Sequence, residues 1–248
     1  MRRALLALLL LPLTQVQAIT NIEEKRRDQD ADGWQNSASA GFDAQSGNNE
    51  KRIWNLGLNT SWQSPVNRVF GWYTRNYESL NSETASDNTF SHLRYVHNHR
   101  DFFGQETFLQ YERDPFAALQ YRFLAGAGVR FQKRWQDDQV IRQGVGLFHE
   151  QVKETEADGS ETTELTRLNL YTHGETKLGY SHLLGTIYLQ PSVDDTDDVR
   201  ALARLTLRIP VSKATDLRWN WQTRYDSMPP EGTEYHNHQT QLAVSVRF

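Results

Sequence analysis

The sequence predicts an all-β protein, a transmembrane antiparallel up-and-down β-barrel of about 12 strands. Three observations predict this fold. Segments rich in aromatic and β-branched residues alternate with turn-forming clusters, apolar residues recur at every second position within the segments, and the connections alternate between long and short. No stretch combines a helical period with helix caps, so we expect no long helix.

The expected strands cover residues 33–45, 51–63, 66–78, 88–99, 103–113, 118–133, 138–153, 162–176, 180–191, 198–211, 215–226 and 235–248. Their number is even, as bacterial single-chain barrels require. The odd-numbered connections are mostly longer and acidic, as at 79–87, 154–161, 192–197 and 227–234. The even-numbered ones are tight, as at Ser64-Pro65 and Leu178-Gly179. Because barrels have short periplasmic turns and longer external loops, the odd-numbered connections are expected outside.

Period-two alternation assigns one face of each strand to lipid and the other to the lumen. In strand 118–133 the apolar face comprises Leu119, Tyr121, Phe123, Ala125, Ala127, Val129 and Phe131. The opposite face comprises Gln120, Arg122, Gly126, Gly128, Arg130 and Gln132. An arginine at the lipid midplane costs about 2–4 kcal/mol, so the polar face must line the lumen. Strand 66–78 is ambiguous, because its two faces compete for lipid with the sets Val69, Tyr73, Tyr77 and Phe70, Trp72.

Two tryptophans provide a measure of the membrane-spanning height. Trp54 and Trp62 lie on the same face of strand 51–63. At about 3.3 Å per residue and a tilt of about 40°, they are separated by roughly 20 Å along the membrane normal, close to the apolar band of about 25 Å between aromatic girdles. A soluble core is the alternative environment, and the polar face opposite the tryptophans favours the girdle.

Both ends of the chain carry features of export. Residues 1–18 have a basic start (Arg2, Arg3), an apolar run and small residues before a cleavage site after Ala18, which predicts a cleaved signal peptide. Residues 19–32 are charged and predict a flexible periplasmic segment, and 33–248 the barrel. The last strand alternates apolar residues up to Phe248, a pattern that resembles the signature presented to the barrel-assembly machinery. We therefore expect a location in a Gram-negative outer membrane, with its lipids and lipopolysaccharide as partners.

Composition excludes several classes of protein. The chain has no cysteine, so neither a disulfide nor an N-terminal lipid on cysteine is available. Without Arg2 and Arg3, the 27 basic residues fall to 25 against 31 acidic ones, which argues against nucleic acid as a partner. No sequence feature predicts a cofactor. A soluble periplasmic β-protein remains as an alternative that membrane extraction would separate.

Four sequence blocks resemble a known family. They are Ser46-Gly47-Asn48, the stretch His92-Leu93-Arg94-Tyr95, Glu106-x-Phe108-x-Gln110, and the block from Arg122 to Arg130. Together they are similar to the YdiY-like salt-induced outer-membrane proteins, the family of unknown function DUF481, over essentially the whole mature chain. The resemblance implies an outer-membrane barrel and, through the family name, a stress-related envelope role. It implies no reaction.

The inward faces supply the candidate functional residues. The lumen-lining candidates are Arg94, Glu106, Gln110, Arg122, Arg130, Arg204, Arg208 and Arg224. Arginines outnumber acids in this set, which predicts a small anion-preferring, porin-like pore if the lumen is open. The alternative is a closed structural barrel filled by ion pairs, in which Gly126 and Gly128 leave room for Phe108.

Catalysis and metal binding are not expected. Ser91-His92 and Ser181-His182 are adjacent in strands, so their side chains point to opposite faces, and no phospholipase-like Ser-Asn-Gly element is present. The protein is therefore predicted not to be an enzyme, with a lipid-acting outer-membrane enzyme as the weaker alternative. His97-x-His99 and His236-x-His238 have usable ligand spacing, but they are expected at opposite ends of the barrel. The run from Asp194 to Asp198 is expected to be a solvated loop, with a divalent cation as the alternative.

Overall fold

A computed structural model of the chain describes residues 22–23, 32–136, 139–156, 159–212, 214–229 and 233–246. Twelve strands form one sheet in which each strand pairs with its neighbours in chain order. All pairings are antiparallel. The prediction of an all-β fold, with about twelve antiparallel strands in up-and-down order, is confirmed.

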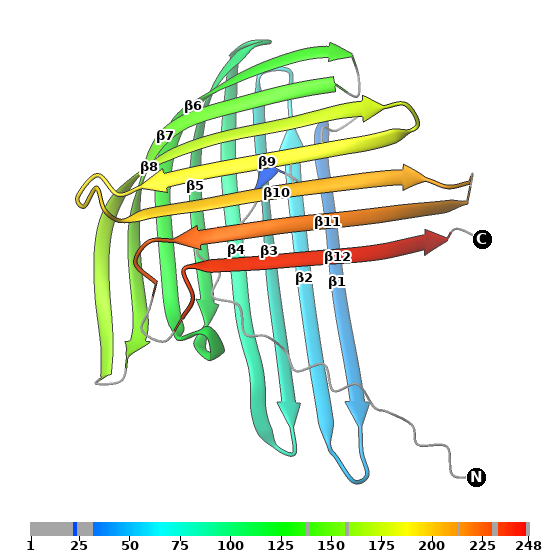
Figure 1. Cartoon of the computed structure of the whole chain (residues 1–248), viewed down its shortest axis with the longest axis vertical. Helices are drawn as coiled ribbons and strands as arrows, with labels where there is room; N and C mark the ends of the chain where they lie inside the picture. The colour runs from blue at the N-terminus through cyan, green and yellow to red at the C-terminus, as the bar shows by residue number, and fades with distance from the viewer. Residues whose placement is uncertain are drawn as a thin grey trace.

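The strands are β1 (Gly33–Gln45), β2 (Lys51–Gln63), β3 (Asn67–Leu80), β4 (Glu83–Arg100), β5 (Phe103–Asp114), β6 (Leu119–Gln136), β7 (Gln139–Glu156), β8 (Gly159–Leu178), β9 (Ser181–Pro191), β10 (Val199–Pro210), β11 (Thr215–Asp226) and β12 (His236–Val246). One 3-10 turn, η2 (Pro115–Ala117), joins β5 to β6. Figure 1 shows the sheet curling over, so that β9 to β12 cross in front of β1 to β4 with an interior between them. Below, the proximal end is the one at which β1 begins, and the distal end is opposite.

Two of the expected long distal connections are wrong. Residues 79–87 and 154–161 were expected as loops, but β3, β4, β7 and β8 continue through most of them. Between β3 and β4 only Asn81 and Ser82 remain, with φ values of 51° and 68°, the left-handed backbone that a tight hairpin requires. The polar residues of the extended hairpin pair across strands instead, because Asp87 accepts from Arg75 and Arg113. The acidic composition of these residues predicted loops, but in the structure most of them form solvated parts of strands.

The outer face of the sheet is apolar and exposed. Its large exposed hydrophobic side chains include Trp34, Phe42, Trp54, Leu56, Leu58, Leu93, Leu109, Phe123, Phe131, Val145, Leu147, Ile187, Leu189, Leu242 and Val244. The aromatic pairs Trp34–Trp62 and Phe42–Trp54, with ring centroids 6.3 and 4.2 Å apart, lie toward the proximal and distal ends of the β1–β2 hairpin. This arrangement agrees with the predicted aromatic girdles.

The structure resolves the ambiguous strand and corrects one residue. Phe70 and Trp72 of β3 are buried on the inner face. Leu119, expected toward lipid, is also buried at 4% exposure, because the β5–β6 and β6–β7 pairings both shift register beside it.

The inner face mixes charged residues with small apolar clusters. One cluster joins Tyr171, Tyr188 and Leu202 across β8, β9 and β10. Gly126 makes the close approach predicted for it, because a Cβ there would meet the ring of Phe108 and the Cβ of Phe148. At Gly128 a Cβ would meet the backbone of β7 instead, so the prediction that both glycines accommodate Phe108 is wrong for the second.

The two edge strands differ from the rest of the sheet. β1 and β12 each pair on one side, and among the described residues no pairing joins them. Both are exposed along almost their whole length. No helix among the described residues is long and apolar enough to cross a bilayer.

Several predictions concern residues at the chain ends. The signal peptide 1–18 and the terminal Phe248 lie outside the described residues and stay predictions. In the segment 19–32, expected to be flexible, the described Ile22 and Glu23 are buried at 4% and 1% exposure.

Candidate functional site in the lumen

The distal half of the interior is organised around one carboxylate. Glu150 lies on the inner face of β7, six residues before the distal end of that strand, and its side chain has 0% exposure. Its Oε1 accepts from Arg122 Nε and Arg200 Nη1, each at 2.6 Å. Its Oε2 accepts from Arg167 Nε at 2.6 Å. Three arginines from β6, β8 and β10 therefore meet on one glutamate.

The same arginines hold further acids at the distal end. Arg167 donates two bonds to Asp198, from Nη1 at 3.0 Å and Nη2 at 2.6 Å, which is the bidentate geometry of a strong pair. Arg200 donates from Nε to Asp226 at 2.9 Å. We call Glu150, Arg122, Arg167, Arg200, Asp198 and Asp226 the distal network. Because β10 is three strands from β7, the Glu150–Arg200 bond crosses the interior rather than following one hairpin.

The middle of the interior is filled by stacked rings. His92 on β4 lies between Trp72 and Phe108, with ring centroids 4.8 and 5.8 Å away. Its Nδ1 is 3.2 Å from Oε1 of Gln110. The cavity beside these rings has a volume of about 20 Å³, which is room for about one water molecule.

A second charged group lies nearer the proximal end. Arg94 on β4, with its side chain 3% exposed, donates from Nη1 to Glu106 Oε2 at 2.9 Å. Arg130 Nε lies 3.4 Å from the other oxygen of Glu106, and Tyr171 donates to Glu106 at 3.2 Å. The guanidinium of Arg94 also lies over the Phe108 ring, 5.2 Å from its centroid. We call Arg94, Glu106, Arg130 and Tyr171 the proximal seat.

The proximal end opens into a basic hollow. This vestibule has a volume of about 790 Å³ and lies beside the turns that follow β2 and β4 and beside the proximal part of β6. Its charged lining residues are Arg68, Arg100, Arg130, Lys133, Arg134 and Asp101. Arg130 belongs both to the vestibule and to the proximal seat, so the two adjoin. A solute entering from this end would meet an excess of positive charge.

The predicted lumen residues occupy two environments. Buried on the inner face are Arg94, Glu106, Gln110, Arg122, Arg130 and Arg224. Arg204 and Arg208 on β10 are only half-buried. Arg208 donates to Asp216 at 3.0 Å at the proximal edge, with its side chain 41% exposed. The candidates therefore do not converge on one site. Arg122 belongs to the distal network, Arg94, Glu106 and Arg130 to the proximal seat, Gln110 contacts His92 in the middle, and Arg204, Arg208 and Arg224 lie on β10 and β11.

Some of the most deeply buried polar residues were not among the residues predicted to line the lumen. Glu150 and Arg167 of the distal network have 0% exposure, and Arg142 and His173, toward the proximal ends of β7 and β8, have 1%. The signal was present in the alternation of strand β7, where Val140, Arg142, Phe148, Glu150 and Val152 are all buried on one face. A charged residue in phase with buried apolar neighbours indicates a paired interior charge.

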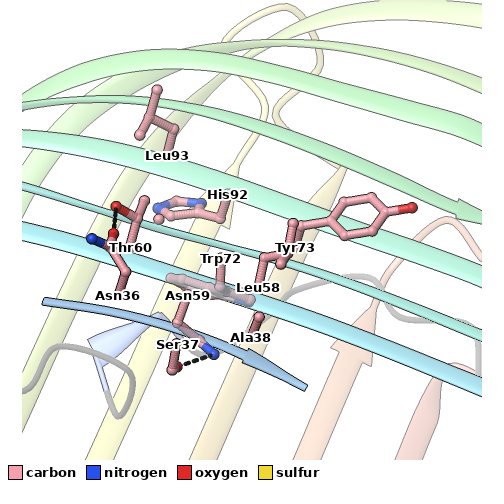
Figure 2. Close-up of a pocket in the computed structure, with 11 residues that line it drawn as sticks. Asn36, Ser37, Ala38, Leu58, Asn59, Thr60, Trp72, Tyr73, His92 and Leu93 are labelled. Atoms are coloured by element: carbon pink, nitrogen blue, oxygen red, sulfur yellow. Dashed lines mark hydrogen bonds between the residues drawn. The ribbon is translucent and has the colours of Figure 1, made fainter. Parts of the chain in front are cut away.

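A further hollow of about 510 Å³ lies over β1 to β4 (Figure 2). Its lining includes Leu58 and Leu93, which are 54% and 47% exposed on the outer face, and Gly71, which lacks a side chain. Thr60 donates to Asn36 within it at 2.7 Å. Its lining also includes Trp72 and His92, which are buried on the inner face, so the hollow is not confined to the outer surface of the sheet.

The histidine pairs do not gather into a larger cluster. His97 and His99 have ring centroids 4.6 Å apart, and His97 Nδ1 is 2.7 Å from the Asn67 side-chain oxygen. His236 and His238 are stacked 6.1 Å apart on β12. Within the described ranges no group of three or more histidine, cysteine or acidic residues could hold a metal ion.

Comparison with known proteins gives one family and several loose structural likenesses. A family model described as "Protein of unknown function, DUF481" matches residues 38–248. No curated protein matches the sequence. The structure is similar to the NanC porin, with 8% identity, a TM-score of 0.47 and coverage of 86% of this chain and 99% of that one.

Two autotransporter domains are also similar. The translocator domain of NalP from Neisseria meningitidis shares 14% identity, with a TM-score of 0.44 and coverage of 89% of this chain and 90% of that one. The β-domain of the Bordetella autotransporter BrkA shares 10% identity, with a TM-score of 0.33 and coverage of 87% and 98%.

Proposed function

The chain belongs to the family of proteins of unknown function DUF481, and from that membership and the geometry of its interior we propose that it is an integral outer-membrane β-barrel closed by its own side chains. The observation that carries the proposal is Glu150, which has 0% exposure and binds arginines from three strands. One of these bonds spans the interior from β7 to β10. We expect a network that spans the interior in this way to obstruct the passage of a hydrated ion.

The outer face supports the proposed location. Exposed side chains such as Leu147, Ile187 and Leu242, at 51%, 60% and 67%, would be unfavourable in water over so many strands and favourable in lipid. The proposed partners are outer-membrane lipids, lipopolysaccharide and, through the C-terminal strand with its predicted terminal Phe248, the barrel-assembly machinery. The protein should fractionate with outer membranes and migrate faster on a gel before heating than after it. Recovery in the soluble periplasmic fraction would contradict the proposal.

The closed state is testable by electrical recording. Purified folded protein in planar lipid bilayers should give no stable conductance, since aromatic rings fill the middle of the interior and the Glu150–Arg200 bond spans its distal half. Replacing Glu150 by alanine should produce openings, provided that the variant still folds. Stable conductance of the unmodified protein would overturn the proposal of a closed barrel.

A small anion-preferring pore is the second candidate function. The vestibule favours it, because its lining includes five basic residues and one acidic residue. Under this candidate the reversal potential in a KCl gradient should show selectivity for chloride, and charge reversal by Arg134→Glu should reduce that selectivity. Cation selectivity would exclude this candidate.

We propose no catalytic step for this protein. His92 is buried and engaged with two aromatic rings and Gln110, and not with a nucleophile. A stress-related envelope role is the cellular proposal that the family resemblance adds. Growth of a deletion strain at high salt, compared with its complemented parent, tests that role.

A further inference from the structure

Two residues that precede the first strand of the sheet lie in the interior that the sheet encloses. Ile22 and Glu23 are buried at 4% and 1% exposure, ten or more positions before β1 begins at Gly33. Ile22 packs in an apolar cluster with Phe70, Trp72 and Val96 of β3 and β4. In Figure 1 this short blue segment lies between the back of the sheet and the strands that cross in front of it.

The carboxylate of Glu23 reaches the proximal seat. Its Oε1 accepts from Arg94 Nη1 at 3.2 Å, and its side chain has 0% exposure. The same nitrogen donates to Glu106 at 2.9 Å, so Arg94 lies between one acid of the sheet and one acid from outside it. Within the group formed by Arg94, Arg130, Glu106 and Glu23, two positive charges face two negative charges. Without Glu23 the same group would hold an excess positive charge, which water in the adjoining vestibule would have to solvate.

We propose that Arg94 is a carboxylate-binding site inside the barrel and that Glu23 is its resident ligand, so that residues 22–23 plug the lumen above the vestibule. The apolar cluster around Ile22 and the guanidinium of Arg94 recognise two different parts of this ligand, an aliphatic side chain and an adjacent carboxylate. The inference rests on the proposed barrel but does not require that the barrel conducts. If the predicted cleavage after Ala18 occurs, the plug consists of the fourth and fifth residues of the mature chain.

Thiol labelling tests the seating directly, because the chain has no cysteine of its own. The full-length gene carrying Ile22→Cys is expressed, and the folded protein from membranes is treated with a membrane-impermeant maleimide. Labelling should be at least about tenfold slower than for Ser46→Cys, at an exposed position after β1. Equal labelling rates at the two positions would overturn the proposal.

Variants of the two partners test the chemistry of the site. In the Ile22→Cys background, both Arg94→Gln and Glu23→Gln should raise the labelling rate about tenfold, whereas Glu23→Asp should preserve part of the protection because it keeps a carboxylate. Arg208→Gln is the matched control, because Arg208 pairs with Asp216 at the proximal edge. Unchanged labelling in both Arg94→Gln and Glu23→Gln would show that the carboxylate does not hold the plug.

Gel mobility before heating identifies any variant that fails to fold, and the Glu23→Gln variant leaves every residue of the sheet intact. The labelling result is independent of conductance. A conducting barrel in which the thiol at position 22 is protected would support the carboxylate site at Arg94 but would contradict both the closed barrel and the plugging of the lumen by residues 22–23. A silent barrel with rapid labelling would contradict the carboxylate site and leave the closed barrel supported.

Discussion

The distal network and the proximal seat both pair arginines with carboxylates, but the carboxylates come from different parts of the chain. At the distal end, the acids that meet Arg122, Arg167 and Arg200 come from strands of the sheet or from residues directly before or at a strand end. At the proximal seat, one of the two acids on Arg94 is Glu23, 71 positions away in sequence and outside the sheet. A bond between two strands persists as long as the barrel does, but a bond to an outside segment can be broken while the sheet stays intact.

The surroundings of the two regions also differ. The distal network centres on side chains with no exposure, whereas the proximal seat adjoins the vestibule through Arg130. Removing one partner of a buried ion pair costs about 3–5 kcal/mol, because the remaining charge is left in a poor solvent. Near an open vestibule, water can solvate the charge that is left and reduce the cost. We therefore expect the distal network to determine stability and the proximal seat to determine occupancy of the lumen.

The largest expected effect is at Glu150. Glu150→Gln removes the negative charge shared by three guanidinium groups and should destabilise the folded barrel by about 3–5 kcal/mol. The measurement is urea unfolding in phospholipid vesicles, followed by tryptophan fluorescence. Glu164→Gln is the control for the same chemical change, since Glu164 is exposed and accepts from Gln151 on the outside. A loss at position 150 no larger than at position 164 would mean that the distal network is not structural.

A smaller effect is expected where packing supports the proximal seat. At Gly144 an added Cβ would overlap the ring of Tyr171, which donates to Glu106, so Gly144→Ala must displace that ring. The expected cost is about 1–3 kcal/mol, as for other overpacked interiors. Gly174→Ala is the matched control, because nothing lies within 4 Å of its added Cβ. If both substitutions leave unfolding unchanged, Tyr171 is not fixed in the seat.

The order of the strands could be predicted from the sequence because each strand is marked by local signals. Alternation and turn chemistry set the ends of β1, β2 and β11 at the same residues as in the structure. Register shifts beside Leu119 could not be foreseen, because a bulge changes the facing of a residue without changing its apolar character. The ends of β3 and β4 were missed because charged residues are as suitable for a solvated strand as for a loop.

The types of residue in the candidate site could be predicted from the sequence, but the pairs that these residues form could be predicted less well. Alternation identified Arg94, Glu106 and Arg122 as inward, but pairing across the interior depends on how far the sheet curls, which no single strand encodes. The Glu150–Arg200 bond joins residues 50 positions apart. Glu23 was missed for a different reason: its neighbours in sequence are charged and lack a period, which is typical of a flexible segment.

The smallest effect is expected when the glutamate bound at the proximal seat is replaced by glutamine, as Glu150 is in the distal network. Glu23→Gln removes one carboxylate from Arg94 but leaves Glu106 bound to the same guanidinium, and a glutamine oxygen can still accept one hydrogen bond. The free energy of unfolding should therefore fall by about 1 kcal/mol or less, well below the loss for Glu150→Gln. The two variants are compared by urea unfolding under identical conditions. Equal losses would show that residues 22–23 are as integral to the barrel as its strands, and that they are not an exchangeable ligand.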